Sequence, residues 1–522
     1  MRAPEGGGAR VAAFAAKSNM PLTSDDPLLT PGLAEVGNRA LERASGAPAS
    51  VGNSVKLLLD AEQNFPAWLD AIRRAERTVF FESYIFADDE IGKVFADALA
   101  ERAKDGVYVC VVYDWLGSSR MRTLAAMMRA AGVHIRVFNP PSLDSPLGWF
   151  TRDHRKTIAV DGKVGFVSGL CASARWLGNP AKALEPWRDT GIEIRGPAVA
   201  EIEHAFAQVW DVCGEPMPTQ HLTPASAMQH IGDSRLRVIA GVPSAASTFR
   251  LDLAVASMAR KRLWLTDAYF VATSAYVQAL RAASKDGVDV RLLVPGASDI
   301  PALRPLSRAQ YRPLLESGVR VYEWDGTMLH AKCAVADGLW ARVGSTNLNL
   351  ASWMTNYELD VAIEDTTFAG TMAKQFLQDL CRATEIVLTS RNRVRESETT
   401  DATLTKVAAP RPAVRRSMSG SASRAAAGAV SVGSALGAAF TNRRSLGPAE
   451  AGLLFIMAAT VVTSGIVAAI WPRVLAWPLA FVLLWLGVGW ALKGIALRNK
   501  SHAASSDAKA AAAAPASPAK ES

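Results

Sequence analysis

Two short stretches of this sequence place a histidine, a lysine and an aspartate at the same spacing, H-x-K-x-x-x-x-D. The two sets are His154, Lys156 and Asp161, and His330, Lys332 and Asp337. In a β-strand, residues two apart point to the same face, so each imidazole is expected beside its ammonium group. One imidazole of such a pair can attack a phosphorus atom while the other protonates the leaving group. The pattern therefore predicts a phosphoryl-transfer site to which both stretches contribute.

The two lysines bear on the question of cofactors. An ammonium group beside each histidine would neutralise the oxygens of a phosphoryl group in transfer, which is the charge that a metal ion would otherwise supply. Histidine suits both roles, because its ordinary pKa of about 6.5 leaves the neutral and charged forms available near neutrality. We expect no metal and no other cofactor at this site.

The aspartates of the two sets occupy a different place in the pattern. Each lies on the opposite face of a strand from its lysine, and each is followed by a glycine between two apolar runs. An Asp-Gly pair in that setting is typical of a β-hairpin turn. We include Asp161 and Asp337 among the candidate catalytic residues, but the pattern favours a role in holding the turn or bracing nearby groups over direct chemistry.

Further residues could support the two histidines. Gly344, Ser345 and Asn347 follow the second hairpin and could donate backbone N–H groups and a side-chain amide to phosphate oxygens. Asp189 and Glu358 stand at similar distances after the two histidines, where they could orient the imidazoles and fix their tautomers. Surface ion pairs are the alternative role for these two carboxylates.

Other segments recur in the same order, which indicates an internal repeat. Residues 75–86 match 259–270, residues 104–109 match 285–290, and residues 132–138 match 318–322. Short apolar runs alternate with helical patterns, an order typical of parallel strands joined by right-handed crossovers. The sequence therefore predicts an α/β fold of two tandem α/β/α repeats, packed as a pseudo-two-fold unit that brings the two histidine stretches face to face.

Composition divides the chain into six segments. The predicted segments are a disordered leader at 1–48, the first repeat at 49–225, the second repeat at 226–391, a disordered basic linker at 392–447, a transmembrane helical hairpin at 448–497 and a disordered tail at 498–522. The leader, linker and tail are rich in small and polar residues, and they contain too few apolar residues to offset the entropy of ordering them.

The C-terminal hairpin carries the membrane prediction. Residues 451–471 and 474–492 are two uncharged runs, each long enough to cross the hydrocarbon core of a bilayer as a helix. Pro472 and Arg473 separate the runs, and more basic residues flank the open side of the hairpin than its turn. By the positive-inside rule, both ends of the hairpin face the cytoplasm, and the repeats lie on the same side. Two buried core helices are the alternative.

The overall composition limits the partners and the compartment. The 522 residues carry a net charge of +8, which suits a phosphate-bearing partner but does not choose between nucleic acid and an anionic lipid surface. The five cysteines are odd in number and form no C-x-x-C pair. This argues against a disulfide framework or a thiolate zinc site and favours a reducing compartment.

The paired motifs resemble those of the phospholipase D superfamily. The full signature, H-x-K-x-x-x-x-D followed by G-S-x-N, is present within residues 330–347. Residues 81–86, 152–156, 187–190 and 347–350 are most similar to the bacterial cardiolipin synthase branch. One position departs from the family pattern, since Cys171 in the first copy replaces the expected asparagine.

This resemblance implies a ping-pong reaction through a phosphohistidine intermediate, without a metal. It implies a membrane-associated phosphatidyltransferase in the cytoplasmic membrane of a bacterium. The phosphatidyl donor would be an anionic phospholipid, phosphatidylglycerol or a related lipid, and the acceptor would be the headgroup hydroxyl of a second lipid.

Three other functions are compatible with the same motifs. They are a phospholipase D that uses water as the acceptor, a nuclease or other phosphodiesterase, and a scaffold whose first half has lost its site. A basic chain would bind nucleic acid through its phosphate backbone. The predicted membrane hairpin argues against that partner, and we expect no nucleic acid to bind.

Overall fold

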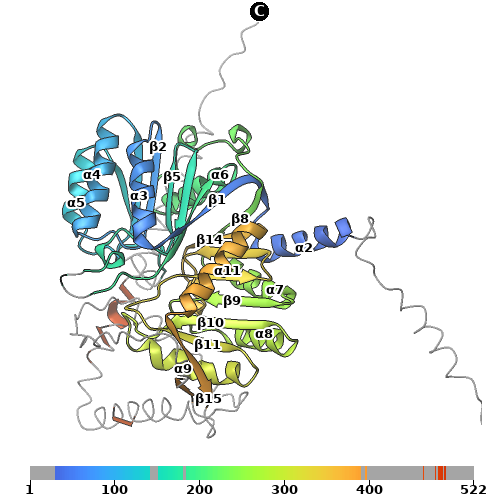
Figure 1. The fold of residues 1–522 in the computed structure, drawn as a ribbon. Helices are drawn as coiled ribbons and strands as arrows, with labels where there is room; N and C mark the ends of the chain where they lie inside the picture. The colour runs from blue at the N-terminus through green and yellow to red at the C-terminus, as the bar shows by residue number, and fades with distance from the viewer. Residues whose placement is uncertain are drawn as a thin grey trace, which may run out of the picture.

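One mixed β-sheet runs through the described part of the chain (Figure 1). The computed structural model describes residues 30–141, 151–179, 181, 184–388 and 394–396, together with isolated positions between 462 and 488. The sheet has 16 strands, and helices pack on its faces. In Figure 1 the strands and helices of residues 50–212, blue to green, lie above those of the second half, green to orange.

The first half of the sheet extends from its centre to one edge. From centre to edge the order is β1 (Ser50–Leu59), β7 (Thr190–Arg195), β6 (Val164–Ser168), β5 (Lys156–Val160), β2 (Thr78–Ser83), β3 (Tyr108–Asp114) and β4 (His134–Phe138). β2, β3 and β4 are parallel, whereas β5, β6 and β7 pair antiparallel with their neighbours. The helices are α3 (Asp60–Arg73), α4 (Glu90–Lys104), α5 (Arg122–Ala130) and α6 (Ala198–Val212).

The second half has the same strand order. From centre to edge it runs β8 (Ser234–Gly241), β14 (Glu358–Glu364), β13 (Trp340–Gly344), β12 (Cys333–Ala336), β9 (Arg262–Thr266), β10 (Asp289–Pro295) and β11 (Arg320–Trp324), followed by β15 (Ala383–Leu388) and β16 (Val394–Glu396). Its helices are α7 (Ser247–Met258), α8 (Ser274–Lys285), α9 (Leu303–Leu315), α10 (Leu350–Met354) and α11 (Thr366–Leu380). β1 and β8 pair antiparallel and join the two halves.

The α/β alternation expected from the sequence is confirmed. The apolar run at 107–113 forms β3, which is buried along nearly its whole length, as expected for a strand that is covered on both faces. The helix before it, α4, begins after Asp89, whose carboxylate accepts hydrogen bonds from the N–H groups of Ile91 and Gly92. This helix links β2 to β3, which pair in parallel.

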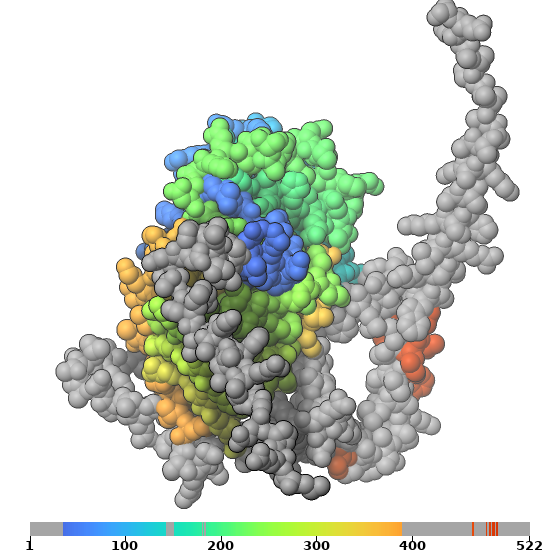
Figure 2. All heavy atoms as spheres, turned by 90° about the vertical axis from the view of Figure 1, so that its right-hand side faces the viewer, coloured from blue at the N-terminus to red at the C-terminus, as the bar shows by residue number. Residues whose placement is uncertain are grey.

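Residues 30–45 correct the predicted limit of the disordered leader. They form α2 (Thr30–Ser45), which packs against α7 and is visible as a blue patch on the surface in Figure 2. Leu41 is buried in the core of the second half, and the Arg237 side chain donates a hydrogen bond to the carbonyl of Ala47. Composition did not reveal this helix, because its stability depends on tertiary packing more than on its own propensity. Residues 1–29 lie outside the described residues.

The membrane prediction concerns segments beyond the folded halves. Among the described residues, no helix combines the length and the apolar character needed to cross a bilayer. The predicted hairpin at 448–497 lies outside the described residues except for isolated positions. The same holds for the linker, apart from 394–396, and for the tail.

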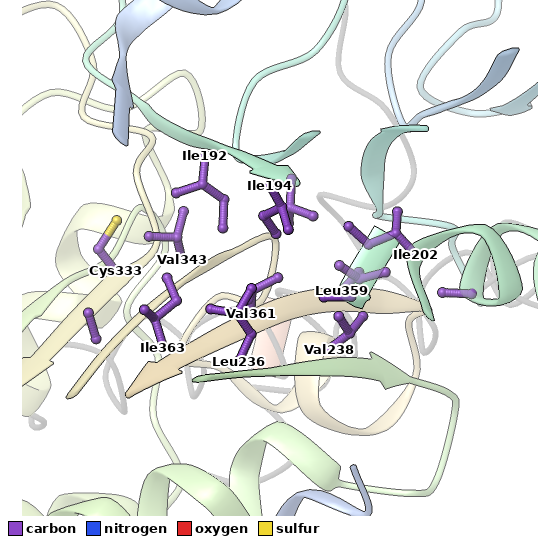
Figure 3. Close-up of a cluster of buried hydrophobic side chains, with 14 of the residues drawn as sticks. Ile192, Ile194, Ile202, Leu236, Val238, Cys333, Val343, Leu359, Val361 and Ile363 are labelled. Atoms are coloured by element: carbon purple, nitrogen blue, oxygen red, sulfur yellow. The ribbon is translucent and has the colours of Figure 1, made fainter. Parts of the chain in front are cut away.

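The two halves share a hydrophobic core at their junction. Ile192 and Ile194 of β7 belong to one buried cluster with Val343 of β13 and Val361 of β14 (Figure 3). Helix α6 of the first half also contacts β8, and helix α11 of the second half contacts β1. Because apolar side chains of both halves bury one another, we expect the halves to unfold together.

Replacing Ile194 with alanine tests this shared core. Ile194 is fully buried, so Ile194→Ala is expected to destabilise the protein by about 2–5 kcal/mol and to lower the midpoint of a single unfolding transition. Calorimetry and chemical denaturation of the full chain measure this. Leu339→Ala is the control, because Leu339 is 60% exposed and its truncation should change stability by less than about 0.5 kcal/mol. Two separate transitions, with only one shifted, would contradict the shared core.

Candidate active site

The two H-x-K stretches lie at corresponding ends of two strands. His154 precedes β5, and the first residue of that strand, Lys156, pairs with Ser83 at the end of β2. His330 precedes β12, whose first residue pairs with Thr266 at the end of β9. Both histidines therefore lie at the carboxyl ends of parallel strands, which is the edge where α/β sheets commonly bind ligands.

Backbone hydrogen bonds fasten each histidine to the opposite half. The His154 N–H donates to the carbonyl of Tyr357 at 2.9 Å, and the Tyr357 N–H donates to the carbonyl of Arg152 at 2.8 Å. In the other copy, the His330 N–H donates to the carbonyl of Arg188 at 2.7 Å, and the Arg188 N–H donates to that of Met328 at 2.9 Å. The two connections are equivalent, and they bring the two histidine stretches into one site.

The orienting carboxylates are exchanged between the halves. His154 Nδ1 lies 2.9 Å from Glu358 Oε2, and His330 Nδ1 lies 2.8 Å from Asp189 Oδ2. A carboxylate only accepts hydrogen bonds, so Nδ1 carries the proton and Nε2 keeps its lone pair in the neutral ring. The sequence positions of Asp189 and Glu358 indicated their role but not this exchange, in which each half supplies the partner of the other half's histidine.

Burial and neighbouring charges set the protonation of these groups. Burial lowers the pKa of His330 to about 4, and the Lys332 ammonium group acts in the same direction. Burial also lowers the pKa of His154, against the opposing charge of Glu358. In Asp189 and Glu358, burial opposes ionisation, but the charge and hydrogen bond of the partner histidine outweigh it and leave each pKa below its ordinary value. The resting site thus favours neutral imidazoles beside ionised carboxylates.

Both lysines are buried beside their histidines. The Nζ of Lys156 and that of Lys332 each donate to the backbone carbonyl of the histidine two residues earlier. Lys332 Nζ also lies 3.0 Å from His330 Nδ1, and burial lowers the pKa of Lys332 to about 8. Each Nζ faces an aromatic ring, that of Tyr84 at 5.3 Å or that of Tyr269 at 5.7 Å from the centroid. The lysines thus provide positive charge in a poorly solvated place.

The turn after the second hairpin braces a carboxylate. Ser345 Oγ donates to Glu358 Oε2 at 2.6 Å and accepts from the Leu359 N–H at 3.0 Å. A Cβ at Gly344 would lie 2.4 Å from Asp360 Oδ1, so the close approach of β14 requires glycine there. Asn347 is 4% exposed, and its Oδ1 has no hydrogen-bond partner among the described atoms. Of the three predicted phosphate-binding residues, Ser345 therefore contacts the histidine partner directly.

The first half reaches a similar result with different residues. Trp176 Nε1 donates to Asp189 Oδ2 at 2.8 Å, which takes the place of the Ser345 hydroxyl. A Cβ at Gly169 would lie 2.1 Å from Asp189 Oδ1, so this glycine leaves room for the carboxylate. Cys171, at the position of the expected asparagine, is buried. Sequence reasoning missed Trp176, because a tryptophan after the turn is equally compatible with simple core packing.

Arg155 was also missed, although it lies between His154 and Lys156. It is fully buried on the opposite side of the strand from them. Its guanidinium group donates to the carbonyls of Glu358, Ala205 and Gly241 at 3.1, 2.6 and 3.0 Å. Arg155 thus ties the first half to the backbone of the carboxylate that orients His154. The available signal was its place between His154 and Lys156, since a residue between them points to the opposite side from both.

The two motif aspartates lie away from the reacting groups. Asp161 accepts hydrogen bonds from the N–H groups of Glu76, Arg77 and Thr78, and Asp337 accepts from those of Arg260, Lys261 and Arg262. Both have left-handed backbone angles, with φ of 58° and 55°, at the hairpin turns. β5 lies between His154 and Asp161, and β12 lies between His330 and Asp337. A strand extends by about 3.3 Å per residue, so each aspartate is at the far end of its strand from the histidine. Their contacts are those of the turn-holding role that the sequence favours, and a catalytic role for Asp161 and Asp337 stays a prediction.

Other groups near the site are packed rather than open. Within the described residues, no group of three or more His, Cys, Asp or Glu side chains is arranged to hold a metal ion. The His330 ring has three aromatic neighbours, Trp176, Trp187 and Tyr269, with centroids at 5.4, 5.6 and 5.8 Å. Tyr84 lies edge-on to His154 at 5.1 Å. These rings restrict the orientation of both imidazoles.

Substitutions at Asp337 separate the turn role from chemistry. Asp337→Ala removes an acceptor from three N–H groups and is expected to lower the free energy of unfolding by about 1–3 kcal/mol, without lowering kcat of the folded enzyme. Asp337→Asn is the matched control, because asparagine tolerates a left-handed backbone and keeps an acceptor oxygen. A folded Asp337→Ala variant with a large loss of kcat would contradict the turn role.

The low pKa of His330 predicts a loss of stability in acid. The folded-state pKa of about 4 lies below the ordinary 6.5, so the contribution is complete above pH 6.5 and is lost as the pH falls towards 4. Its size is about 3 kcal/mol. His330→Gln removes this term, so urea unfolding from about pH 7 to pH 4 should show a smaller loss of stability in the variant than in the wild type. Parallel pH dependences of the two proteins would refute the assignment.

Comparison with known proteins identifies the family. Residues 253–380 match the family described as "Cardiolipin synthase, PLD-like domain". A cardiolipin synthase of Geobacillus thermodenitrificans is 33% identical over 347 residues, which cover 65% of this chain and 68% of the relative. Cardiolipin synthase A of Pseudomonas aeruginosa is 34% identical over 368 residues, covering 69% of this chain and 73% of the relative.

A solved structure supports the same fold. The phosphatidylserine synthase of Haemophilus influenzae has a TM-score of 0.52 at 15% identity, covering 67% of this chain and 92% of that one. At this identity the likeness shows the phospholipase D-like α/β fold alone. The relatives' identity and coverage carry the assignment further: the chain belongs to the cardiolipin synthase family of phospholipase D-type phosphatidyltransferases.

Proposed function

We propose that this protein transfers a phosphatidyl group from phosphatidylglycerol to the headgroup hydroxyl of a second phosphatidylglycerol, through a phosphohistidine. The observation that carries the proposal is the carboxylate exchange, His154 with Glu358 and His330 with Asp189. It leaves two imidazoles with defined tautomers in one site. The names of the relatives support the same reaction, since they are cardiolipin synthases.

The reaction divides into two steps that use the imidazoles in turn. In the first step, the Nε2 lone pair of one neutral imidazole attacks the phosphorus, and the bond from phosphorus to the headgroup glycerol oxygen breaks. The other imidazole, which takes up a proton before this step, gives that proton to the leaving oxygen. In the second step, a headgroup hydroxyl of another lipid gives its proton to the imidazole that protonated the glycerol oxygen. The hydroxyl oxygen then attacks the phosphorus. The bond from phosphorus to the histidine nitrogen breaks. The products are cardiolipin and glycerol.

The other groups of the site support charge development on the phosphoryl oxygens. Lys156 and Lys332 are buried next to the histidines, where a cation interacts strongly with an anion because little water screens it. In the free protein both ammonium groups are held by backbone carbonyls. We propose that they turn to the phosphoryl oxygens when the lipid binds. Gly344, Ser345 and Asn347 are proposed to add polar contacts from the turn.

The substrate implies a membrane location. Phosphatidylglycerol resides in a bilayer, so we propose that the protein is associated with the cytoplasmic membrane of a bacterium through the predicted hairpin at 448–497. The excess of basic residues on the open side of that hairpin supports a cytoplasmic position for the catalytic halves. Phospholipids and the membrane are thus the proposed partners, without nucleic acid.

We also propose that the two halves are tandem phospholipase D-like repeats. The same strand order on either side of the β1–β8 pair supports this, as do the two equivalent histidine stretches. A pseudo-two-fold arrangement explains why each half completes the site of the other.

Lipid products test the function directly. The purified full chain, incubated with phosphatidylglycerol vesicles, is expected to form cardiolipin and glycerol. His154→Ala and His330→Ala should each lower the rate by about 10²-fold or more, because each removes one of the two proton or phosphoryl carriers. His204→Ala is the matched control, since His204 lies on α6 and its ring contacts the carbonyl of Ala200.

Each other outcome of this experiment has a definite meaning. Phosphatidic acid in place of cardiolipin would show hydrolysis, and full activity in either histidine variant would refute the two-histidine reaction. Cleavage of DNA without lipid turnover would favour a nuclease. Rapid quenching with labelled phosphatidylglycerol, followed by peptide mapping, identifies the histidine that carries the phosphatidyl group.

A further inference from the structure

We infer that Asp60 is a positioning residue of this site, which holds the backbone of Asp189 and through Asp189 orients the His330 imidazole. Asp60 lies outside both H-x-K stretches, at the point where β1 ends and α3 begins. The kinetic part of this inference rests on the proposed function. A spectroscopic part stands without it.

The backbone of Asp60 is strained. Its φ is 52°, in the left-handed region that residues other than glycine seldom adopt. The surroundings hold this conformation, because the buried amide of Asn64 donates to the carbonyls of Leu58 and Asp60 at 3.1 and 2.8 Å. Strain that the surrounding structure enforces is typical of functional sites.

Asp60 clamps Asp189 by binding both of its backbone groups, the N–H and the carbonyl. Asp60 Oδ1 accepts a hydrogen bond from the Asp189 N–H at 2.8 Å, and the Asp60 N–H donates to the Asp189 carbonyl at 3.0 Å. Both backbone groups of Asp189 are thereby fixed by one residue that is 129 positions away in the sequence. The position of the Asp189 backbone is therefore fixed, and the Asp189 side chain extends from it to His330.

The same carboxylate holds the neighbouring arginine. Asp60 Oδ1 accepts from Arg188 Nη1 at 3.1 Å, and the other end of the Arg188 guanidinium group pairs with Asp379 of α11 at 2.9 Å. The Arg188 carbonyl accepts the N–H of His330. Asp60 therefore contacts Arg188, whose carbonyl binds the backbone N–H of His330, and Asp189, whose carboxylate binds the His330 ring.

The second half offers an internal comparison. Helix α7 is the first helix after β8, as α3 is after β1, and residues 242–246 separate the two elements. The residue before α7, Ala246, is also left-handed, with φ of 52°. Ala246 has no side chain that could reach Glu358, whose carbonyl is instead bound by Arg155. A left-handed residue at the start of the first helix is thus common to both halves. Only in the first half does that residue have a carboxylate, and this carboxylate binds the partner of His330.

Replacing Asp60 with glycine separates the contribution of its carboxylate from that of its left-handed backbone. Asp60→Gly keeps the left-handed turn and the backbone N–H bond to the Asp189 carbonyl, but it removes the carboxylate that holds the Asp189 N–H and Arg188. We therefore expect kcat for cardiolipin formation to fall by about 10- to 100-fold while KM changes by less than about twofold. Asp60→Asn keeps an acceptor oxygen and tolerates left-handed angles, and it should restore most of kcat. Ala246→Gly, the matched control, should leave kcat unchanged.

The pKa of His330 provides the readout that a merely structural residue would not move. The charge and hydrogen bond of Asp189 raise the pKa of His330 against burial and Lys332. A displaced Asp189 therefore lowers this pKa further, and the limb of the kcat/KM profile that His330 controls moves to lower pH. NMR titration of labelled histidine rings in the full chain measures the shift without any substrate, in Asp60→Gly against Ala246→Gly.

Two results overturn the inference. One is a folded Asp60→Gly variant with the wild-type His330 pKa and kcat, and the other is an equal loss in Ala246→Gly. If Asp60→Gly does not fold, Asp60→Ser replaces it with the same expectations. Absence of lipid transfer by the wild type would refute the proposed function but not the inference, because the NMR comparison still decides whether Asp60 positions His330.

Discussion

The rest of the structure depends on the exchange of carboxylates between the two halves. His154 needs Glu358 and His330 needs Asp189, so neither half contains a complete set of groups. Keeping both pairs within hydrogen-bond distance requires a rigid connection between units that are far apart in the sequence. The β1–β8 pair, the shared apolar core and the Arg155 guanidinium group provide that connection. Packing at the junction is therefore part of the catalytic machinery, because it sets the distances.

Burial of so many charges is costly unless each has a partner. Here the carboxylates are matched by histidines, and the lysines are held by backbone carbonyls and face aromatic rings. Burial nevertheless lowers the pKa of Lys332 to about 8. A phosphate group that enters the site adds negative charge beside these cations. Binding an anionic headgroup therefore stabilises the protonated lysine, and preorganised positive charge is strongest where water is excluded.

Sequence reasoning recovered the features that local spacing encodes. The H-x-K parity, the Asp-Gly turns and the alternation of strands and helices all depend on neighbouring residues, and they predicted the fold class and the two histidines. The exchange did not follow, because it joins residues 141 and 204 positions apart. Trp176 and Asp60 were missed for the same reason, since their partners are decided by tertiary packing. Helix α2 was missed because packing, not composition, stabilises it.

The two histidines have different surroundings, although the two motifs have the same spacing in the sequence. The indole of Trp176 only donates to Asp189, whereas the Ser345 hydroxyl donates to Glu358 and also accepts from Leu359. Aromatic rings surround His330, and burial lowers its pKa to about 4. His154 has both oxygens of Glu358 within 3.1 Å of Nδ1, which raises its pKa, but burial has the larger effect and leaves the pKa of His154 below its ordinary value. Two-step transfer requires one imidazole that is neutral when it attacks and another that takes up and releases a proton, and the two rings, with their different surroundings, need not be equivalent for these two roles.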